Sequence, residues 1–169
     1  MWDGFFPRTL KDELETVKGK RRSIFRFAGV VSFVGLGMIF SSLGAYPDSF
    51  SISSCSPVVF SYAWLFVFFL RGLVIGIKKY SVCSLRDRAC LFFSVVSCAL
   101  SMTWFCFLFR FSFFSISCFS LLTASVISAF LLRYQAKHSI LLTLIEIPVL
   151  FWLLVNLFAT LKLVVVKYV

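Results

Sequence analysis

Runs of about twenty apolar residues, separated by short polar gaps, constrain the fold of this chain more than any other feature. A helix needs ~20 predominantly apolar residues to cross the hydrocarbon core of a bilayer. The chain has 169 residues, which leaves room for five such runs: 27–46, 58–77, 89–109, 111–132 and 140–161. We therefore expect an all-α integral membrane protein, a bundle of five transmembrane helices.

The composition supports a membrane environment and a single folded unit. Hydrophobic residues make up 60% of the chain and the mean hydropathy is +0.98, whereas soluble domains are nearer ~45–50% apolar. One small core cannot bury so much apolar surface, so the bilayer must solvate much of it. We expect a basic amphipathic N-terminal segment at 1–26 and a five-helix transmembrane domain at 27–169.

The helix boundaries follow from the polar gaps. The apolar stretch 89–132 is too long for one crossing and about right for two, with Arg110 at its middle, so we expect a tight turn there. The polar residues 133–138 are predicted to form the loop before the last span, and 46–57 the loop after the first.

Basic residues decide the orientation. Seven of the 17 Lys and Arg residues lie within the first 26 positions. With the gaps after the second and fourth spans, one side of the membrane carries thirteen basic residues and the other three. The positive-inside rule then places the N-terminus in the cytosol and the C-terminus across the membrane. This flanking pattern, with no basic stripe on a polar face, argues against nucleic-acid binding despite the net charge of +10.

The N-terminal segment repeats apolar residues at helical spacing, with Leu10, Leu14 and Val17 separated by charged residues. A short amphipathic helix on an anionic membrane surface fits this pattern. A solvated tail fits it equally well.

Charged residues inside the spans are candidates for function, because a charge in the bilayer interior is costly. Arg71 in the second span and Glu146 in the fifth are expected at similar depth near the cytosolic face, where they could form an ion pair. Independent snorkelling or a direct ligand role are the alternatives. Asn156 lies deeper and would either hydrogen-bond between helices or face a ligand.

No catalytic constellation is visible. The chain has six scattered cysteines, no Cys-x-x-Cys pair and one histidine, His138, whereas a zinc site needs about four N/S ligands at close spacing. Neither a nucleophile–base pair nor paired carboxylates nor a phosphate-binding glycine loop is present. We expect a non-enzymatic protein without a metal site or an obligatory cofactor.

The positions of the tryptophans carry a family resemblance. The second span holds Phe60, Trp64 and Gly72, with Pro57 before them and Phe68 between. The third span and the turn after it contribute Ser101, Trp104, Phe107 and Arg110. The predicted fourth loop holds Arg133 and Tyr134, and the fifth span holds Pro148 and Trp152. Five spans with this pattern resemble the TspO/MBR family, the translocator proteins also called peripheral benzodiazepine receptors. The basic N-terminal extension and Lys162-Leu163 look most like its plant branch.

The resemblance implies a five-helix pocket that binds porphyrins, haem or sterol-like ligands, often in a homodimer. By position, the residues lining it would be Phe60, Trp64, Ser101, Trp104, Phe107, Trp152 and Asn156. Stacked aromatic faces suit a flat apolar ligand, although plain helix packing must account for most of the 23 Phe residues.

We therefore expect a translocator or sensor for tetrapyrroles or sterol-like ligands in a multi-pass membrane protein. In a eukaryote its membrane would be an endomembrane or the mitochondrial outer membrane. The alternative is a structural or accessory subunit of a membrane complex. An enzyme acting on a porphyrin is the weakest hypothesis.

The orientation generates a first prediction. Single cysteines at positions 48 and 84 in a cysteine-free background should react with an impermeant thiol reagent from opposite sides of the membrane. Labelling of both from the same side would contradict the five-span topology.

Overall fold

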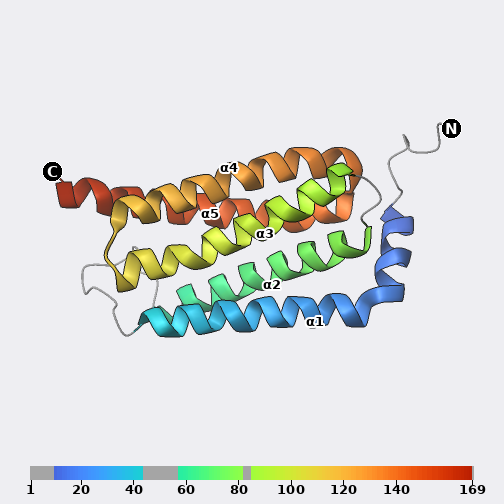
Figure 1. The fold of residues 1–169 in the computed structure, drawn as a ribbon, viewed down its shortest axis with the longest axis horizontal. Helices are drawn as coiled ribbons and strands as arrows, with labels where there is room; N and C mark the ends of the chain where they lie inside the picture. The colour runs from blue at the N-terminus through green and yellow to red at the C-terminus, as the bar shows by residue number, and fades with distance from the viewer. Residues whose placement is uncertain (1–9, 44–56, 82–84, 169) are drawn as a thin grey trace.

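A computed structural model describes residues 10–43, 57–81 and 85–168. Within these ranges the chain forms five α-helices, and a π-helical turn, η1, continues the third of them (Figure 1). The elements are α1 (Leu10–Leu43), α2 (Pro57–Ser81), α3 (Leu85–Phe105), η1 (Cys106–Arg110), α4 (Phe114–His138) and α5 (Ile140–Tyr168). The predicted all-helical class is confirmed for the described part of the chain.

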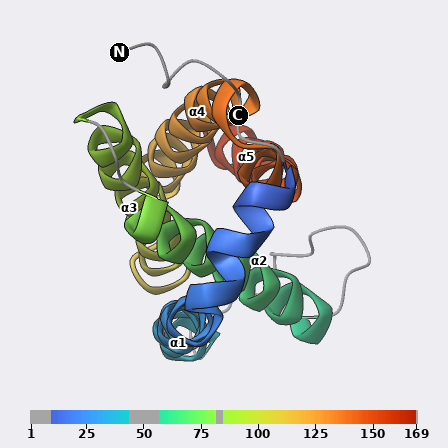
Figure 2. The same ribbon diagram turned by 90° about the vertical axis from the view of Figure 1, so that its right-hand side faces the viewer.

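The helices lie roughly along one long axis (Figure 1) and are arranged around it (Figure 2). Going round the bundle, α1 packs on α2, α2 on α5, α5 on α4, α4 on α3 and α3 on α1, while α2 also contacts α3. The α3–α4 turn and the start of α5 lie at opposite ends of the bundle (Figure 1). Helix α2 thus contacts α1, α3 and α5.

Four segments are long and apolar enough to cross a membrane, by length and composition: Phe60–Lys79, Leu85–Arg110, Phe114–His138 and Ile140–Lys162. Large apolar side chains face outward, as expected for contact with lipid; Phe119, Phe130 and Phe158 are each at least 70% exposed. The chain is therefore a multi-pass membrane protein by these criteria. The predicted first span, 27–46, falls within α1 up to Leu43, and its last residues lie outside the described ranges. Helix α1 is not among the four segments that meet these criteria in the described residues, so the fifth crossing stays a prediction.

The turn predicted at Arg110 lies immediately after it. Phe111–Phe113 separate η1 from α4, and the Phe113 N–H donates to the Phe107 carbonyl at 2.8 Å. Ser112 adopts φ 53°, a left-handed conformation that few residues other than Gly, Asn and Asp adopt readily. The wide π turn and this residue together reverse the chain within three positions.

The loop predicted at 133–138 is wrong, because α4 continues through it to His138. Arg133, Gln135 and Lys137 are good helix formers, so the change to polar residues does not end the helix. The break comes at Ser139, whose backbone is extended at φ −157°. Its hydroxyl accepts a hydrogen bond from the Leu142 N–H at 3.2 Å and so caps the start of α5.

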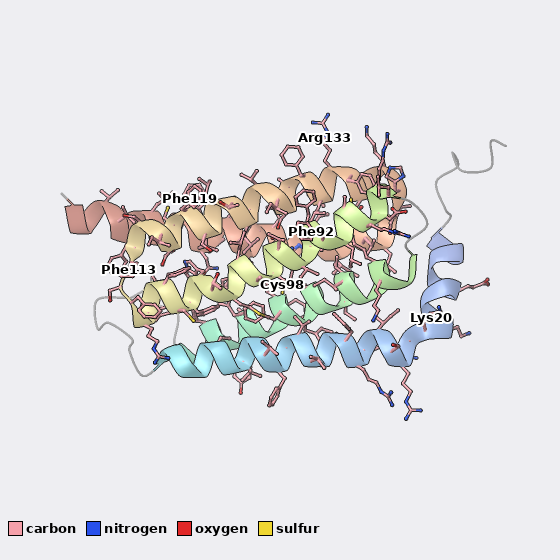
Figure 3. All side chains as sticks on the ribbon, viewed as in Figure 1. Lys20, Phe92, Cys98, Phe113, Phe119 and Arg133 are labelled. Carbon is pink, nitrogen blue, oxygen red and sulfur yellow. The ribbon has the colours of Figure 1, made fainter. Side chains whose placement is uncertain are left out.

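Helix α1 crosses the predicted domain boundary at 26/27 without interruption. Figure 1 shows its first part at a steep angle to the rest, and Figure 3 places Lys20 close to the bend. Gly19 lies beside it, and glycine weakens a helix by about 1 kcal/mol relative to Ala. The direction of the chain thus changes near residue 20 within one helix.

Small residues let α1 and α2 pack closely. Gly72 and Gly76 of α2 face Ala28 and Ile24 of α1; a Cβ at residue 72 would lie 2.6 Å from the Ala28 Cα. On the other side, the Phe68 ring occupies the space that a Cβ of Gly35 would need. This Gly-x-x-x-Gly surface is the type that allows backbone-to-backbone contact between membrane helices.

Replacing Gly72 by Ala should therefore destabilise the protein, because the backbone of α1 must move. We expect a loss of about 1–3 kcal/mol in the free energy of unfolding, the usual cost of overpacking, measured by denaturation in mixed detergent micelles. Gly37→Ala is the matched control, because nothing lies within 4 Å of its Cβ position and Ala has the higher helix propensity. Equal effects of both changes would contradict close packing at Gly72.

Candidate functional site

Aromatic rings from three helices meet at the centre of the bundle, and we call them the aromatic cluster. Pairwise ring contacts join Phe60, Trp64, Phe68, Trp104, Phe105, Phe109 and Trp152. Trp64 and Trp104 are stacked at 5.2 Å between ring centroids, and Phe105 meets Trp64 edge-on at 4.9 Å. Such pairs contribute roughly 0.5–1.5 kcal/mol beyond burial of their area, so the cluster holds α2, α3 and α5 together.

The three tryptophans of the cluster share an unusual feature. The indole N–H groups of Trp64, Trp104 and Trp152 are buried and have no hydrogen-bond acceptor. A buried donor left unsatisfied costs about 1–3 kcal/mol, and surrounding lipid chains offer no acceptor. The cluster therefore holds three donors that an acceptor from outside the chain could satisfy.

Four of the seven residues predicted to line a ligand pocket belong to this cluster: Phe60, Trp64, Trp104 and Trp152. They contact one another rather than surround an opening. Ser101 and Asn156 are also buried, but each bonds within its own helix: the Ser101 hydroxyl to the Ser97 carbonyl at 2.7 Å, and the Asn156 amide to the Trp152 carbonyl at 2.7 Å. Phe107 is only half-buried and lies outside the rings in contact.

The predicted pocket residues omit three members of the cluster: Phe68, which was noted only as part of the family pattern, and the two that the sequence interpretation missed, Phe105 and Phe109. Both are almost fully buried, at 1% and 2% exposed. Helical spacing could have identified them, since Trp104, Phe105, Leu108 and Phe109 form one face at i, i+1, i+4 and i+5, whereas Phe107 falls on the opposite side.

The structure brings together the two charged residues expected to pair. Arg71 Nη1 donates to Glu146 Oε1 at 3.1 Å, and both side chains are 0% exposed. Neither side chain extends to the headgroups, as snorkelling would require. The pair joins α2 to α5 in a region where an isolated charge would be strongly unfavourable.

Serines complete the polar surroundings of the pair. Arg71 Nη2 donates to the Ser128 hydroxyl at 2.6 Å, and Ser128 is 3.1 Å from the Ser97 hydroxyl. Ser97 in turn donates to the Ala124 carbonyl at 3.1 Å. The polar layer formed by Arg71, Glu146, Ser128 and Ser97 therefore includes one residue from each of α2, α3, α4 and α5.

A second polar group lies nearer the end where α2 terminates. Lys78 Nζ donates to the Ser94 hydroxyl at 2.9 Å and, with the Gln135 amide assigned by its hydrogen bonds, to the Gln135 side-chain oxygen at 2.9 Å. The sequence interpretation assigned Lys78 and Gln135 to loops. Both are instead buried in helices, at 5% and 1% exposed.

The aromatic cluster and the polar layer are stacked along the bundle. Trp64 precedes Arg71 by seven residues in α2, and Ser97 precedes Trp104 by seven in α3. In α5, Glu146 precedes Trp152 by six. At ~1.5 Å rise per residue these spacings correspond to about 10 Å along the helices, so an apolar site adjoins a charged one.

A surface hollow lies away from both layers, along the first part of α1. It has a volume of about 730 Å³, and basic side chains line most of it: Lys18, Arg21, Arg22 and Arg26. All four are exposed. Their chemistry suits anionic lipid headgroups; whether this segment lies on a membrane surface or is a solvated tail stays a prediction.

Comparisons with protein-family models, curated proteins and solved structures found no match to this chain. The resemblance to the TspO/MBR family therefore rests on the motif positions alone.

The ion pair generates the third prediction. Arg71→Leu or Glu146→Leu alone should lower the free energy of unfolding by about 3–5 kcal/mol, because each leaves a buried charge unpaired. The double change should recover much of that loss. A double-mutant cycle in detergent or bicelles measures the coupling energy, and a value near zero would mean that the two residues act independently.

Proposed function

We propose that the protein is a membrane-embedded binder of flat, largely apolar ligands, of the tetrapyrrole or sterol-like class, as a TspO-like translocator or sensor. The observation that carries the proposal is the aromatic cluster with its three unsatisfied indole N–H groups. Rings that only held helices together would gain nothing from buried donors without acceptors. A ligand with acceptor atoms would satisfy them.

The ligand would enter by separating rings that now touch. Trp152 is the accessible member, since it is half-buried whereas Trp64 and Trp104 are 0% exposed. Each indole face exposed by this opening would stack on the ligand, in place of its aromatic neighbour. The contact energy lost between rings is thereby recovered against the ligand.

The decisive measurement is a titration of the purified protein in mild detergent with protoporphyrin and with haem, followed by ligand absorbance and tryptophan fluorescence. Saturable binding with quenching supports the proposal. Absence of saturable binding of either, together with co-purifying membrane partners, would support an accessory subunit instead.

The fourth prediction concerns individual rings. Trp64→Ala or Trp152→Ala should weaken ligand binding by about 1–3 kcal/mol if each ring stacks on the ligand, by analogy with bases stacked on aromatic side chains. Trp→Phe at the same positions keeps one six-membered ring but removes the N–H together with the five-membered part of the indole. It should cost less than Trp→Ala and at least the value of one neutral hydrogen bond, about 0.5–1.5 kcal/mol.

Phe119→Ala is the matched control, because this ring is 70% exposed and lies on the outer face of α4 (Figure 3). It should leave the affinity unchanged. Unchanged affinity in both tryptophan variants, with the fold intact by circular dichroism, would mean that these rings only pack helices.

A further inference from the structure

Neither the aromatic cluster nor the polar layer involves the basic residues near the bend of α1. Five exposed basic side chains lie between positions 18 and 26: Lys18, Lys20, Arg21, Arg22 and Arg26. Acidic residues precede this group in the helix, and Glu15 is the last of them before position 48. From Leu10 to Arg26 the helix holds six basic residues against the three acids Asp12, Glu13 and Glu15, so this part of α1 is positively charged.

The basic side chains border the surface hollow of about 730 Å³ described above. Its lining residues are spaced by three or four positions along α1 and so share one face of the helix: Lys18, Arg21, Arg22, Phe25 and Arg26, with Gly19 beside them. A smaller hollow of about 310 Å³ shares Arg22 and Arg26 with it. None of the described residues that line either hollow is acidic. An anion in this place would therefore meet several positive charges and no carboxylate.

The register between α1 and α2 gives the level of the hollow relative to the membrane. Ile24 faces Gly76 and the two helices run antiparallel (Figure 1), so Arg22 is level with Lys78. The apolar segment of α2 ends one residue later, at Lys79. Near this level the first part of α1 turns aside and passes across the end of the bundle (Figure 2). The hollow is thus expected at the depth of the lipid phosphates.

An apolar surface continues from the hollow along α1. Phe25 is 46% exposed, and the Arg21 guanidinium lies 5.7 Å from the centroid of its ring. One and two turns beyond Arg26, Val30 and Phe33 are 62% and 79% exposed. Positive charge at headgroup level with exposed apolar side chains below it matches the two parts of a phospholipid, whereas a soluble anion would use only the first.

The arginine donors favour one kind of headgroup. A guanidinium presents its N–H groups in a planar fork that can bind a phosphate through two hydrogen bonds. A phosphomonoester carries a charge of about −1.5 to −2 at neutral pH and three acceptor oxygens, so two arginines can share it. A phosphodiester has a single charge and one acceptor oxygen fewer, and it would satisfy Arg22 and Arg26 less well.

We propose that the hollow at the bend of α1 binds an anionic phospholipid whose headgroup ends in a phosphomonoester. Arg22 and Arg26 bind the phosphate, and an acyl chain lies along Val30 and Phe33. The bound lipid would hold the first part of α1 at the membrane surface rather than leave it as a solvated tail. The site lies apart from the aromatic cluster and does not depend on the function proposed for it.

The test is native mass spectrometry of the full chain in a neutral detergent, titrated with dioleoyl phosphatidic acid or with dioleoyl phosphatidylglycerol, which is a phosphodiester. The wild-type protein should bind phosphatidic acid at least about fivefold more tightly, which corresponds to about 1 kcal/mol. The double variant Arg22→Gln/Arg26→Gln should lose this preference. Both side chains are exposed, so its circular dichroism should match that of the wild type.

Two control variants remove the same number of exposed charges elsewhere. Arg110→Gln/Lys162→Gln changes the opposite end of the bundle, and Arg86→Gln/Arg88→Gln changes α3 at the same end. Both should keep the preference for phosphatidic acid. An equal loss in the α3 variant would assign the binding to the overall potential of that end and would overturn the site.

The remaining outcomes are equally distinct. Equal binding of the two lipids by the wild type overturns the assignment of a phosphomonoester. A preference that persists in Arg22→Gln/Arg26→Gln places the lipid elsewhere on the protein. Displacement of phosphatidic acid by an excess of inorganic phosphate would show that the site takes soluble phosphate compounds, and this also overturns the proposal. None of these results bears on the titration with protoporphyrin, so the proposed function is tested separately.

Discussion

The bundle depends on the pairing of buried charged side chains that have no contact with solvent. Arg71 and Glu146 are both 0% exposed, and in hydrocarbon each would be prohibitively costly alone. The contact between them fixes α2 against α5, and the serine hydroxyls of Ser128 and Ser97 draw α4 and α3 to the same level. Four helices are thus held in one register by a single polar layer, whereas contacts between apolar side chains would tolerate several registers. The remaining helix, α1, is held by a different kind of contact.

Helix α1 is held against α2 by close packing at glycines, which have no side chain, rather than by polar contacts. Gly72 and Gly76 bring its backbone against α2 at Ala28 and Ile24, a contact that relies on dispersion forces between closely packed atoms. The two kinds of contact use different faces of α2: Gly72 faces α1, while its neighbour Arg71 faces the polar layer. Helix α2 therefore contacts most of the bundle, which explains why three of its large side chains, Trp64, Phe68 and Arg71, are 0% exposed.

The lengths of the apolar runs predicted the helices well, because the thickness of the bilayer sets the length of a helix that crosses it. The same reasoning failed at 133–138, since a polar sequence signals contact with headgroups or a buried partner and says nothing of where hydrogen bonding along the helix stops. Arg71 and Glu146 could be paired from depth alone, as charges inside apolar runs are rare. Ser97 and Ser128 could not be anticipated, because serine is too common in this chain for composition to single out one of them. Phe105 could have been found, since it lies on the same helical face as Trp104 and Leu108.

The three unsatisfied indole donors raise the free energy of the closed aromatic cluster, and a ligand with acceptor atoms would remove this cost. With three indole donors unsatisfied, the closed state gives up about 1–3 kcal/mol for each, which partly offsets the stacking of the rings. An opened state filled by lipid chains would be no better, since they carry no acceptors. An opened state filled by a ligand with acceptors would regain the hydrogen bonds, and so would be favoured by the difference in free energy between the two states. On this argument the tight packing of the cluster is compatible with the proposed binding, and the unsatisfied donors would favour its opening by a ligand that carries acceptors.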